Sequence, residues 1–205
     1  MKFNKLYENI FKGAGNTEVE KRKLQALGKT YNIDFENPDN SKNKWSNLDG
    51  DDWLELLIEY PQFNKYVDWS KINDWSLLLI KQPQFSKFVN WSTMSGEDSA
   101  ELIRKQPQFF KHIDLSNLSG DDWTDILREK PQFADQVDWQ KLSGDNWYWL
   151  LKSQPQFANK TNWSKLTDSN WYWIIKSLPQ FINKCSPKKL NNVLKKYPEL
   201  EKFIK

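Results

Sequence analysis

The sequence predicts an all-α protein, a right-handed α-solenoid of about six to seven repeats of about 24 residues each. Three observations indicate this class. A Trp-containing motif recurs between residues 45 and 186, a proline follows each copy at a nearly constant interval, and the apolar residues between them have helical spacing. Repeats of this length are stacked units, because none can bury its apolar face alone.

The prolines set the register of the repeats. Successive prolines are separated by 22, 24, 24, 24, 24 and 19 residues. A period of 24 is too short for two full helices, so we expect one helix of roughly ten residues and one or two single-turn or 3-10 helices. The prolines are Pro61, Pro83, Pro107, Pro131, Pro155, Pro179 and Pro198.

Each repeat begins with the start signal of a helix. In one copy Ser143 stands at the N-cap and Asn146 follows three residues later, as in a capping box. Trp147, Leu150 and Leu151 then share one apolar face at i, i+3 and i+4. The next proline ends this helix and is well suited to open a second short helix, since its missing N–H costs nothing there. A capped 3-10 turn should link one repeat to the next.

The repeats divide the chain into three parts. Residues 1–44 are expected to form an N-terminal helical cap and linker, 45–186 the six-repeat solenoid and 187–205 a C-terminal capping repeat with a Lys-rich outer face. A second N-terminal helix should run from Thr17 to Gly28. The first helix either caps the first repeat or docks a partner, and its apolar face is Phe3, Leu6, Tyr7, Ile10 and Phe11.

The motif resembles known repeat patterns. The run from Asp138-Trp139 through Trp147 to Pro155-Gln156-Phe157 is similar to the Trp/Pro-Gln-Phe repeats of uncharacterised bacterial and phage proteins, and the resemblance covers residues 45–186. The period and helix rhythm also resemble the leucine-rich variant architecture, in which an α-helix alternates with a 3-10 helix. Neither resemblance implies a catalytic residue.

Composition excludes several classes of protein. Mean hydropathy is −0.84 and no long apolar run occurs, so a transmembrane helix is not expected. The N-terminus lacks the apolar stretch of a signal peptide. Cys185 is the only cysteine, which excludes an intrachain disulfide and suits a reducing cytoplasm.

The sequence has few residues suited to catalysis, and we expect that the protein is not an enzyme and binds no cofactor. His112 is the only histidine, and it occupies a position that tolerates Tyr, Phe, Gln and Lys in other copies. Cys185 has no nearby base. No phosphate loop and no His/Cys metal spacing occurs, and acidic pairs such as Asp51-Asp52 suit the first turn of a helix better than a metal site. The Gln of each Pro-Gln-Phe unit is expected to form a ladder of hydrogen bonds between repeats.

Differences between the copies point to a binding surface. The two positions after the helix Trp are mostly small, charged or mixed in four copies, but the last two full copies place Tyr and Trp there. Residues 163–205 carry nine Lys or Arg against three acids, whereas 45–114 carry seven against eleven. Trp and Tyr are common anchors of interfaces. The candidate partner-binding residues are Tyr148, Trp149, Tyr172, Trp173, Lys152 and Lys176.

Two explanations of this aromatic group stay open. The rings either form a patch that binds a partner or pack under the C-terminal helix and against each other. As a patch they favour a protein partner, with single-stranded nucleic acid as the alternative, because the acidic array repels phosphate. We therefore expect a cytoplasmic, non-enzymatic binding protein. The resemblance to phage and bacterial repeat proteins implies a phage-type inhibitor of a host or defence protein. A structural or virion component assembled through the N-terminal helix is the third possibility.

Overall fold

A computed structural model describes residues 17–41 and 44–204. The predicted first helix, over residues 3–11, lies outside this part of the chain. The chain divides into two compact units between Val89 and Asn90. This division falls inside the repeat array, whereas the predicted limits at 44/45 and 186/187 follow the sequence motif, and the three-part organisation stays a prediction.

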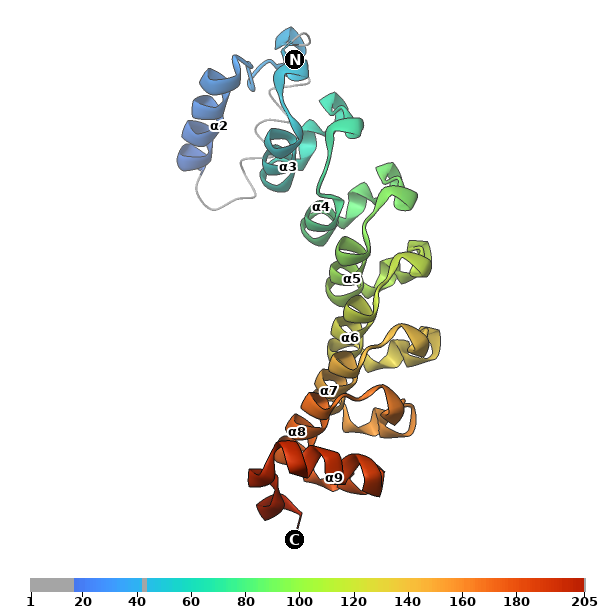
Figure 1. Cartoon of the computed structure of the whole chain (residues 1–205). Helices are drawn as coiled ribbons and strands as arrows, with labels where there is room; N and C mark the ends of the chain where they lie inside the picture. The colour runs from blue at the N-terminus through green and yellow to red at the C-terminus, as the bar shows by residue number, and fades with distance from the viewer. Residues whose placement is uncertain (1–16, 42–43, 205) are drawn as a thin grey trace. The chain divides into compact units, whose positions relative to one another are not determined.

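The N-terminal unit contains three described α-helices (Figure 1). The helices α3 and α4 pack on each other and belong to the first two repeats. The elements are α2 (Thr17–Tyr31), η1 (Pro38–Ser41), η2 (Trp45–Asn47), α3 (Gly50–Glu59), η3 (Pro61–Tyr66), η4 (Trp69–Lys71), α4 (Trp75–Lys81) and η5 (Pro83–Phe88).

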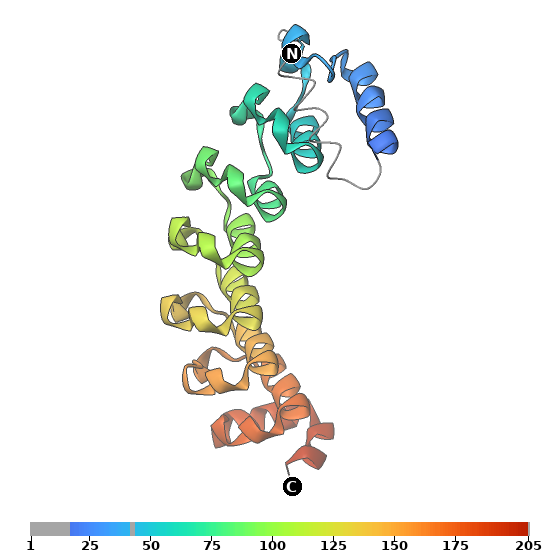
Figure 2. The same ribbon diagram turned by 180° about the vertical axis from the view of Figure 1, so that it is seen from behind.

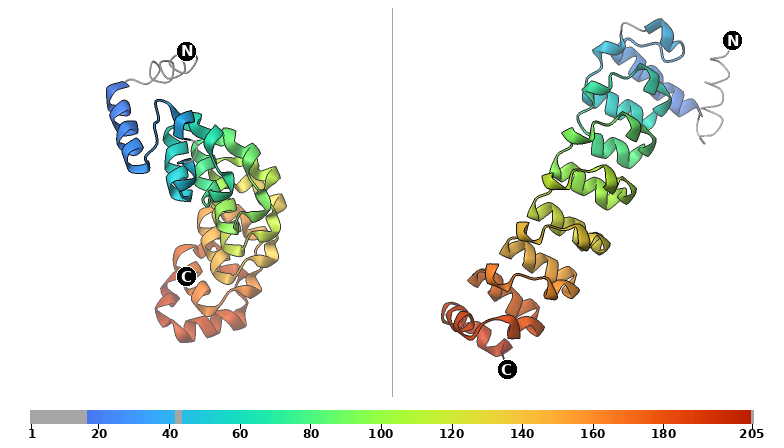
Figure 3. Two further views of the ribbon diagram at one scale, coloured as in Figure 1. Left: turned by 90° about the horizontal axis from the view of Figure 1, so that it is seen from above. Right: turned by 90° about the vertical axis from the view of Figure 1, so that its right-hand side faces the viewer.

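In the C-terminal unit each α-helix packs on the next, from α5 to α9. The views from behind and from the side show these helices in one row and the 3-10 helices in a second layer (Figures 2 and 3). The α-helices are α5 (Gly96–Lys105), α6 (Gly120–Glu129), α7 (Gly144–Ser153), α8 (Asp168–Ser177) and α9 (Pro187–Lys196). The 3-10 helices are η6 (Trp91–Thr93), η7 (Pro107–His112), η8 (Leu115–Asn117), η9 (Pro131–Gln136), η10 (Trp139–Lys141), η11 (Pro155–Asn159), η12 (Trp163–Lys165), η13 (Pro179–Lys184) and η14 (Pro198–Phe203).

The predicted fold class is confirmed. Helix and 3-10 turns alternate with a period of about 24 residues, the α-helices of successive repeats pack on each other within each unit, and the described residues contain no strand. Both short elements of a repeat are 3-10 helices, the one that the proline opens and the linking turn. The handedness of the solenoid stays a prediction.

The predicted start signals also form. Complete capping boxes occur at the first residues of α3, α6, α7 and α8. In α7, Ser143 accepts a hydrogen bond from the backbone N–H of Asn146, and the Asn146 side chain accepts one from the Ser143 backbone. These bonds occupy donors that the first turn of a helix leaves unpaired.

Four of the six repeats build their core from two Trp rings and the Phe of the Pro-Gln-Phe unit, whereas Ser99 and Leu115 each replace one Trp in the other two. In one copy Trp139 stacks on Trp147 with 5.4 Å between ring centroids, and Phe157 is tilted against Trp139 at 5.5 Å. The next copy repeats this arrangement with Trp163 and Trp171 stacked at 5.7 Å. Since such rings remove large apolar areas from water, they dominate the packing energy of the stack.

Polar side chains join successive repeats. Lys141 donates from Nζ to the carbonyl oxygens of Ser116 at 2.8 Å and Leu118 at 2.6 Å, in the preceding linking turn. Asn146, a member of its own capping box, also donates to the carboxylate of Asp121 at 2.5 Å. The same two kinds of bond join α8 and its turn to the repeat before, so these two interfaces have the same polar edge.

The prediction that the Gln of each Pro-Gln-Phe unit forms a ladder of hydrogen bonds between repeats is wrong. The Gln of Pro-Gln-Phe bonds within its own repeat, as Gln156 donates to the side chain of Gln154 at 2.7 Å. The residue before the proline makes the step between repeats: Gln154 donates to the carbonyl oxygen of Arg128 at 2.8 Å, and Gln82 donates to that of Ile58 at 2.7 Å. These carbonyls lie in the last turn of a helix, where no intrahelical donor reaches them.

The second N-terminal helix is three residues longer than predicted. It runs to Tyr31 and ends at Asn32, whose φ of 55° is the left-handed conformation that stops a helix. Ile33 then donates from its backbone N–H to the carbonyl oxygen of Gly28 at 2.9 Å. Gly28 is needed because a Cβ there would lie 2.6 Å from the Ile33 oxygen, so the glycine marks this close approach and not the end of the helix.

Candidate functional site

The four aromatic residues of the predicted patch lie on α7 and α8, and they differ in exposure. Trp149 and Trp173 are 47% and 45% exposed, and they are the exposed large apolar side chains in the described part of the chain. Tyr148 is only 8% exposed and belongs to the core, and Tyr172 is half-buried. The candidate surface is therefore narrower than the sequence indicated.

Helix geometry explains why Tyr148 and Trp149 differ. At about 100° per residue, Trp149 lies on the side of α7 opposite the buried residues Trp147, Leu150 and Leu151. Tyr148 lies at the edge of the buried face, and its ring meets Trp149 edge-on at 5.1 Å. A helical wheel drawn on the predicted core residues would have separated the two.

Tyr172 takes the packing role that was the alternative explanation. Its ring centroid lies 4.7 Å from that of Tyr197, the C-cap residue of α9, and 5.1 Å from that of Trp173. The C-terminal capping repeat thus covers part of Tyr172 but leaves Trp173 exposed.

A lysine accompanies each exposed Trp. The Lys152 Nζ lies 5.0 Å from the centroid of the Trp149 ring, and the Lys176 Nζ lies 5.4 Å from that of Trp173. These are cation–π distances, and both lysines also lie within 6 Å of the neighbouring tyrosine ring. Neither ammonium forms an ion pair with another described residue. We call Trp149, Trp173, Lys152 and Lys176 the tryptophan–lysine face.

A shallow pocket of about 410 Å³ borders Trp149. Its other walls come from α6 and the start of α7, and they include Asp121, Asp125 and Arg128. The Arg128 guanidinium lies 3.3 Å from the carboxylate of Asp125. The Arg104 guanidinium lies 3.6 Å from the same carboxylate. Asp125 and Arg128 beside Trp149 are therefore already paired, and Asp121 accepts a hydrogen bond from the side chain of Asn146.

Sequence reasoning did not single out these paired residues. The sequence nevertheless contains a signal for them. Three residues after Trp149, and after the equivalent residue of each neighbouring repeat, four successive repeats have a basic residue. In α5 and α6 this cation meets carboxylates, since Arg104 pairs with Asp125 and Glu129. In α7 and α8 it meets an aromatic ring. The residues are Arg104, Arg128, Lys152 and Lys176.

The single histidine and the single cysteine of the chain have packing contacts of the kind found elsewhere in the repeats or are buried. His112 is exposed and stacks on Trp91 at 5.0 Å, as Tyr66 stacks on Trp45 at 4.5 Å in another repeat. Burial raises the pKa of the Cys185 thiol to about 11, so the nucleophilic thiolate is scarce at neutral pH. Among the described residues no His, Cys, Asp and Glu side chains gather in a group fit for a metal ion, and none of their helices is long and apolar enough to cross a membrane.

No protein-family model, curated protein or solved structure matches the chain. The resemblance to Trp/Pro-Gln-Phe repeats therefore stays an interpretation of the motif.

Proposed function

We propose that this protein is a non-enzymatic solenoid that binds another protein through its tryptophan–lysine face. The observation that carries the proposal is the exposure of Trp149 and Trp173 at the same position of two successive repeats. Burying a large ring on association is favourable, and Trp is the residue most often found at the energetic centre of an interface. Helical arrays bind partners along one such face.

The chemistry of the face favours an acidic partner. Lys152 and Lys176 hold their ammonium groups over the Trp rings and have no carboxylate partner among the described residues. A partner that places carboxylates over these lysines, and an apolar side chain between the rings, would satisfy both groups. The paired charges of α6 next to Trp149 would form the polar rim of such an interface.

A protein fits this surface better than single-stranded nucleic acid. Nucleic acid also stacks on aromatic rings, but it needs a basic track for its phosphates. Asp121 and Asp145, which form no ion pair among the described residues, lie in and beside this region of α6 and α7, and the net charge of the whole chain is only +3. These carboxylates would repel a phosphate backbone.

The biological role is a further part of the proposal. The resemblance to phage and bacterial repeat proteins favours an inhibitor of a host or defence protein that acts in the cytoplasm. A role in assembly would instead depend on the N-terminal segment, and deletion of residues 1–30 would then abolish assembly while the repeat array still folds.

Affinity capture from host lysate tests the proposal when three forms of the full chain are compared. The first is the wild type, and the second is Trp149→Glu with Trp173→Glu. The third is the matched control Lys111→Glu with Lys160→Glu, which changes two exposed residues of the 3-10 layer. We expect one partner that the wild type and the control retain and the double Trp variant loses.

The captured partner is then purified and its dissociation constant is measured. A loss of at least about 100-fold in affinity is expected for the double Trp variant, because each anchoring Trp typically contributes 2 kcal/mol or more. A folded double Trp variant that binds the partner as well as the wild type does would overturn the proposal. Binding of labelled oligonucleotides that weakens steeply between about 50 and 200 mM salt would favour nucleic acid instead.

A further inference from the structure

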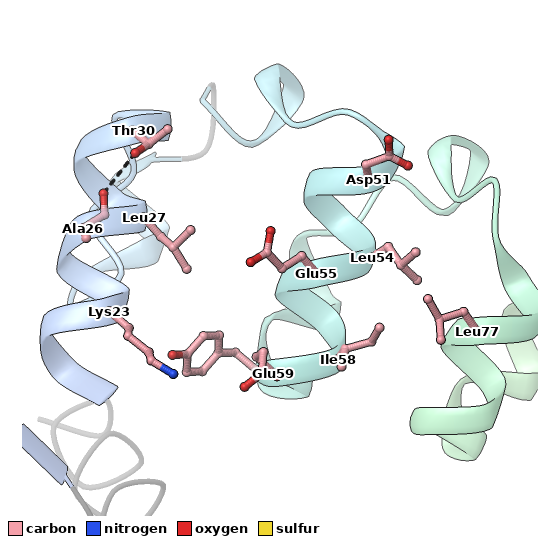
Figure 4. A pocket seen from close by; sticks show the side chains of 11 residues that line it. Lys23, Ala26, Leu27, Thr30, Asp51, Leu54, Glu55, Ile58, Glu59 and Leu77 are labelled. Atoms are coloured by element: carbon pink, nitrogen blue, oxygen red, sulfur yellow. Dashed lines mark hydrogen bonds between the residues drawn. The ribbon is translucent and has the colours of Figure 1, made fainter. Parts of the chain in front are cut away.

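A large cleft lies in the N-terminal unit, between α2 on one side and α3 and α4 on the other. Its volume is about 720 Å³. Figure 4 shows side chains of α2 and α3 on its two sides, with Lys23 and Glu59 at one end and Thr30 and Asp51 at the other. The volume lies in the range of about 300–1,000 Å³ that is typical of binding pockets.

The cleft has apolar walls and an acidic rim. Leu54, Ile58 and Leu77 line it and remain partly exposed to solvent. Glu55 and Glu59 are exposed beside them, and neither forms an ion pair within the part of the chain that the structure describes. An occupant of matching chemistry therefore has apolar side chains along one face and positive charge along its edges.

The repeat register supports an occupied cleft. Ile58 holds the position that is Arg104 in α5, Arg128 in α6 and Lys152 in α7. On the outer face of those helices this position carries a charge, whereas in α3 and α4 it carries an isoleucine, Ile58 and Ile80. Contiguous apolar surface on a soluble protein commonly marks a contact site.

We infer that residues 3–11 of the same chain bind in this cleft. Their apolar residues recur at helical spacing, so a helix formed there has one apolar face. Residues 1–12 contain three lysines and one glutamate, a net charge of +2 that complements the acidic rim. The apolar residues are Phe3, Leu6, Tyr7, Ile10 and Phe11, and the charged ones are Lys2, Lys5, Glu8 and Lys12.

The length of the chain allows this contact. The described chain begins at Thr17, the first residue of α2, and the first α2 residue that lines the cleft is Lys23. Six residues of helix span about 9 Å, and the four residues 13–16 extend to about 13 Å. A helix over residues 3–11 would be about 14 Å long, close to the length of about 15 Å expected for the ten residues of α3.

Photo-cross-linking in the full chain tests the inference. Benzoylphenylalanine replaces Leu6, and mass spectrometry locates the cross-linked peptide. We expect cross-links to α2 and α3 residues that line the cleft. The matched control places the same group at Asn9, on the polar side of the expected helix, where cross-links to Leu54 and Ile58 should fall by at least about tenfold.

The sample is an equal mixture of isotope-labelled and unlabelled protein. Cross-links within one isotope form support the inference, whereas mixed pairs would mean that the segment of a second copy fills the cleft and would overturn it. Cross-links that avoid the cleft, or none at all, would overturn it as well.

A charge exchange gives a second readout. Lys5→Glu with Lys12→Glu should reduce the Leu6-position cross-link, as should Glu55→Lys with Glu59→Lys, and combining all four changes should restore most of it. Thermal unfolding by circular dichroism checks that each variant still folds. Failure to restore the cross-link in a folded fourfold variant counts against charge pairing at this cleft. Because every change lies in the N-terminal unit, these outcomes are separate from the test of Trp149 and Trp173.

Discussion

Lys165 donates a hydrogen bond from its Nζ to the carbonyl oxygen of Leu142, 23 residues earlier, at 2.9 Å. The same ammonium donates to the carbonyl oxygen of Gln140 at 2.5 Å. By charge alone Lys165 belongs to the basic C-terminal region of the chain. Its contacts instead make it part of the interface between two repeats.

This contact predicts that Lys165→Met lowers stability although the side chain is exposed. Two carbonyl oxygens lose a charged donor, and a loss of about 1–2 kcal/mol in the free energy of unfolding is expected. Urea unfolding followed by circular dichroism measures it. Lys160→Met, which removes an exposed lysine whose side chain forms no hydrogen bond among the described contacts, is the control and should change stability by less than about 0.5 kcal/mol.

The two Trp residues of α7 should respond in opposite ways to truncation. Trp147 is fully buried, so Trp147→Ala should cost about 3–5 kcal/mol of stability. Trp149→Ala should leave stability within about 0.5–1 kcal/mol of wild type, because nearly half of its side chain is already exposed. Thermal unfolding compares the two. A severe loss from Trp149→Ala would mean that the ring supports the fold and would weaken its assignment as a binding residue.

Gly144→Ala should destabilise the protein, although alanine is normally the better helix residue. A Cβ at this position would lie 2.7 Å from the carbonyl oxygen of Lys165 and would also meet the side chain of Asn170. Both atoms belong to the next repeat, so the two repeats would have to separate. We expect a loss of about 1–3 kcal/mol, measured by urea unfolding. A gain in stability would show that the repeats adjust without cost.

Acid should loosen the C-terminal capping repeat. The Lys189 ammonium, whose Nζ lies 2.6 Å from the carboxylate of Asp168, holds the pKa of that carboxyl below its usual range. Because the pKa of Asp168 is lower in the folded state than in the unfolded state, the ion pair stabilises the fold at pH values above the unfolded-state pKa of about 3.9. This stabilisation is lost as the pH falls through the folded-state pKa.

Hydrogen exchange of the α9 amides, measured at several pH values from about 5 downward and corrected for the intrinsic rates, checks this prediction. Protection should fall as the Asp168 carboxylate is protonated. In Asp168→Asn the protection should already be low at pH 5 and should show less of this pH dependence. Equal pH profiles for the two proteins would exclude a contribution from the ion pair.

Most of the fold can be predicted from local sequence signals, because these signals recur in successive repeats. Ser143 and Asn146 predict the helix start because a capping box needs only neighbours in sequence. The glutamine ladder shows the limit of such reasoning, since both Gln154 and Gln156 suit a bond between repeats. Which of them reaches Arg128 depends on how far apart two repeats stack, and the motif contains no measure of that distance.

The candidate site was predictable to a similar depth. Comparing the copies located the aromatic pairs, and helix geometry could have separated Trp149 from Tyr148. That Tyr197 is the residue that contacts Tyr172 could not be predicted, because the last repeat has a spacing of 19 residues and not 24. The cleft beside α2 also could not be found in this way, since α2 lies outside the repeat and has no second copy for comparison.

The bonds of Lys141 and Lys165 have a direction, because each lysine serves carbonyl groups made earlier in the chain. During synthesis on the ribosome, the carbonyl oxygen of Leu118 therefore has no bond from Lys141 until 23 more residues have been added. Each repeat that precedes such a lysine is thus completed by its successor, and a nascent chain would gain stability in steps at these interfaces. A chain that ends before Lys141 or Lys165 would leave the carbonyl groups of the preceding turn without their charged donor.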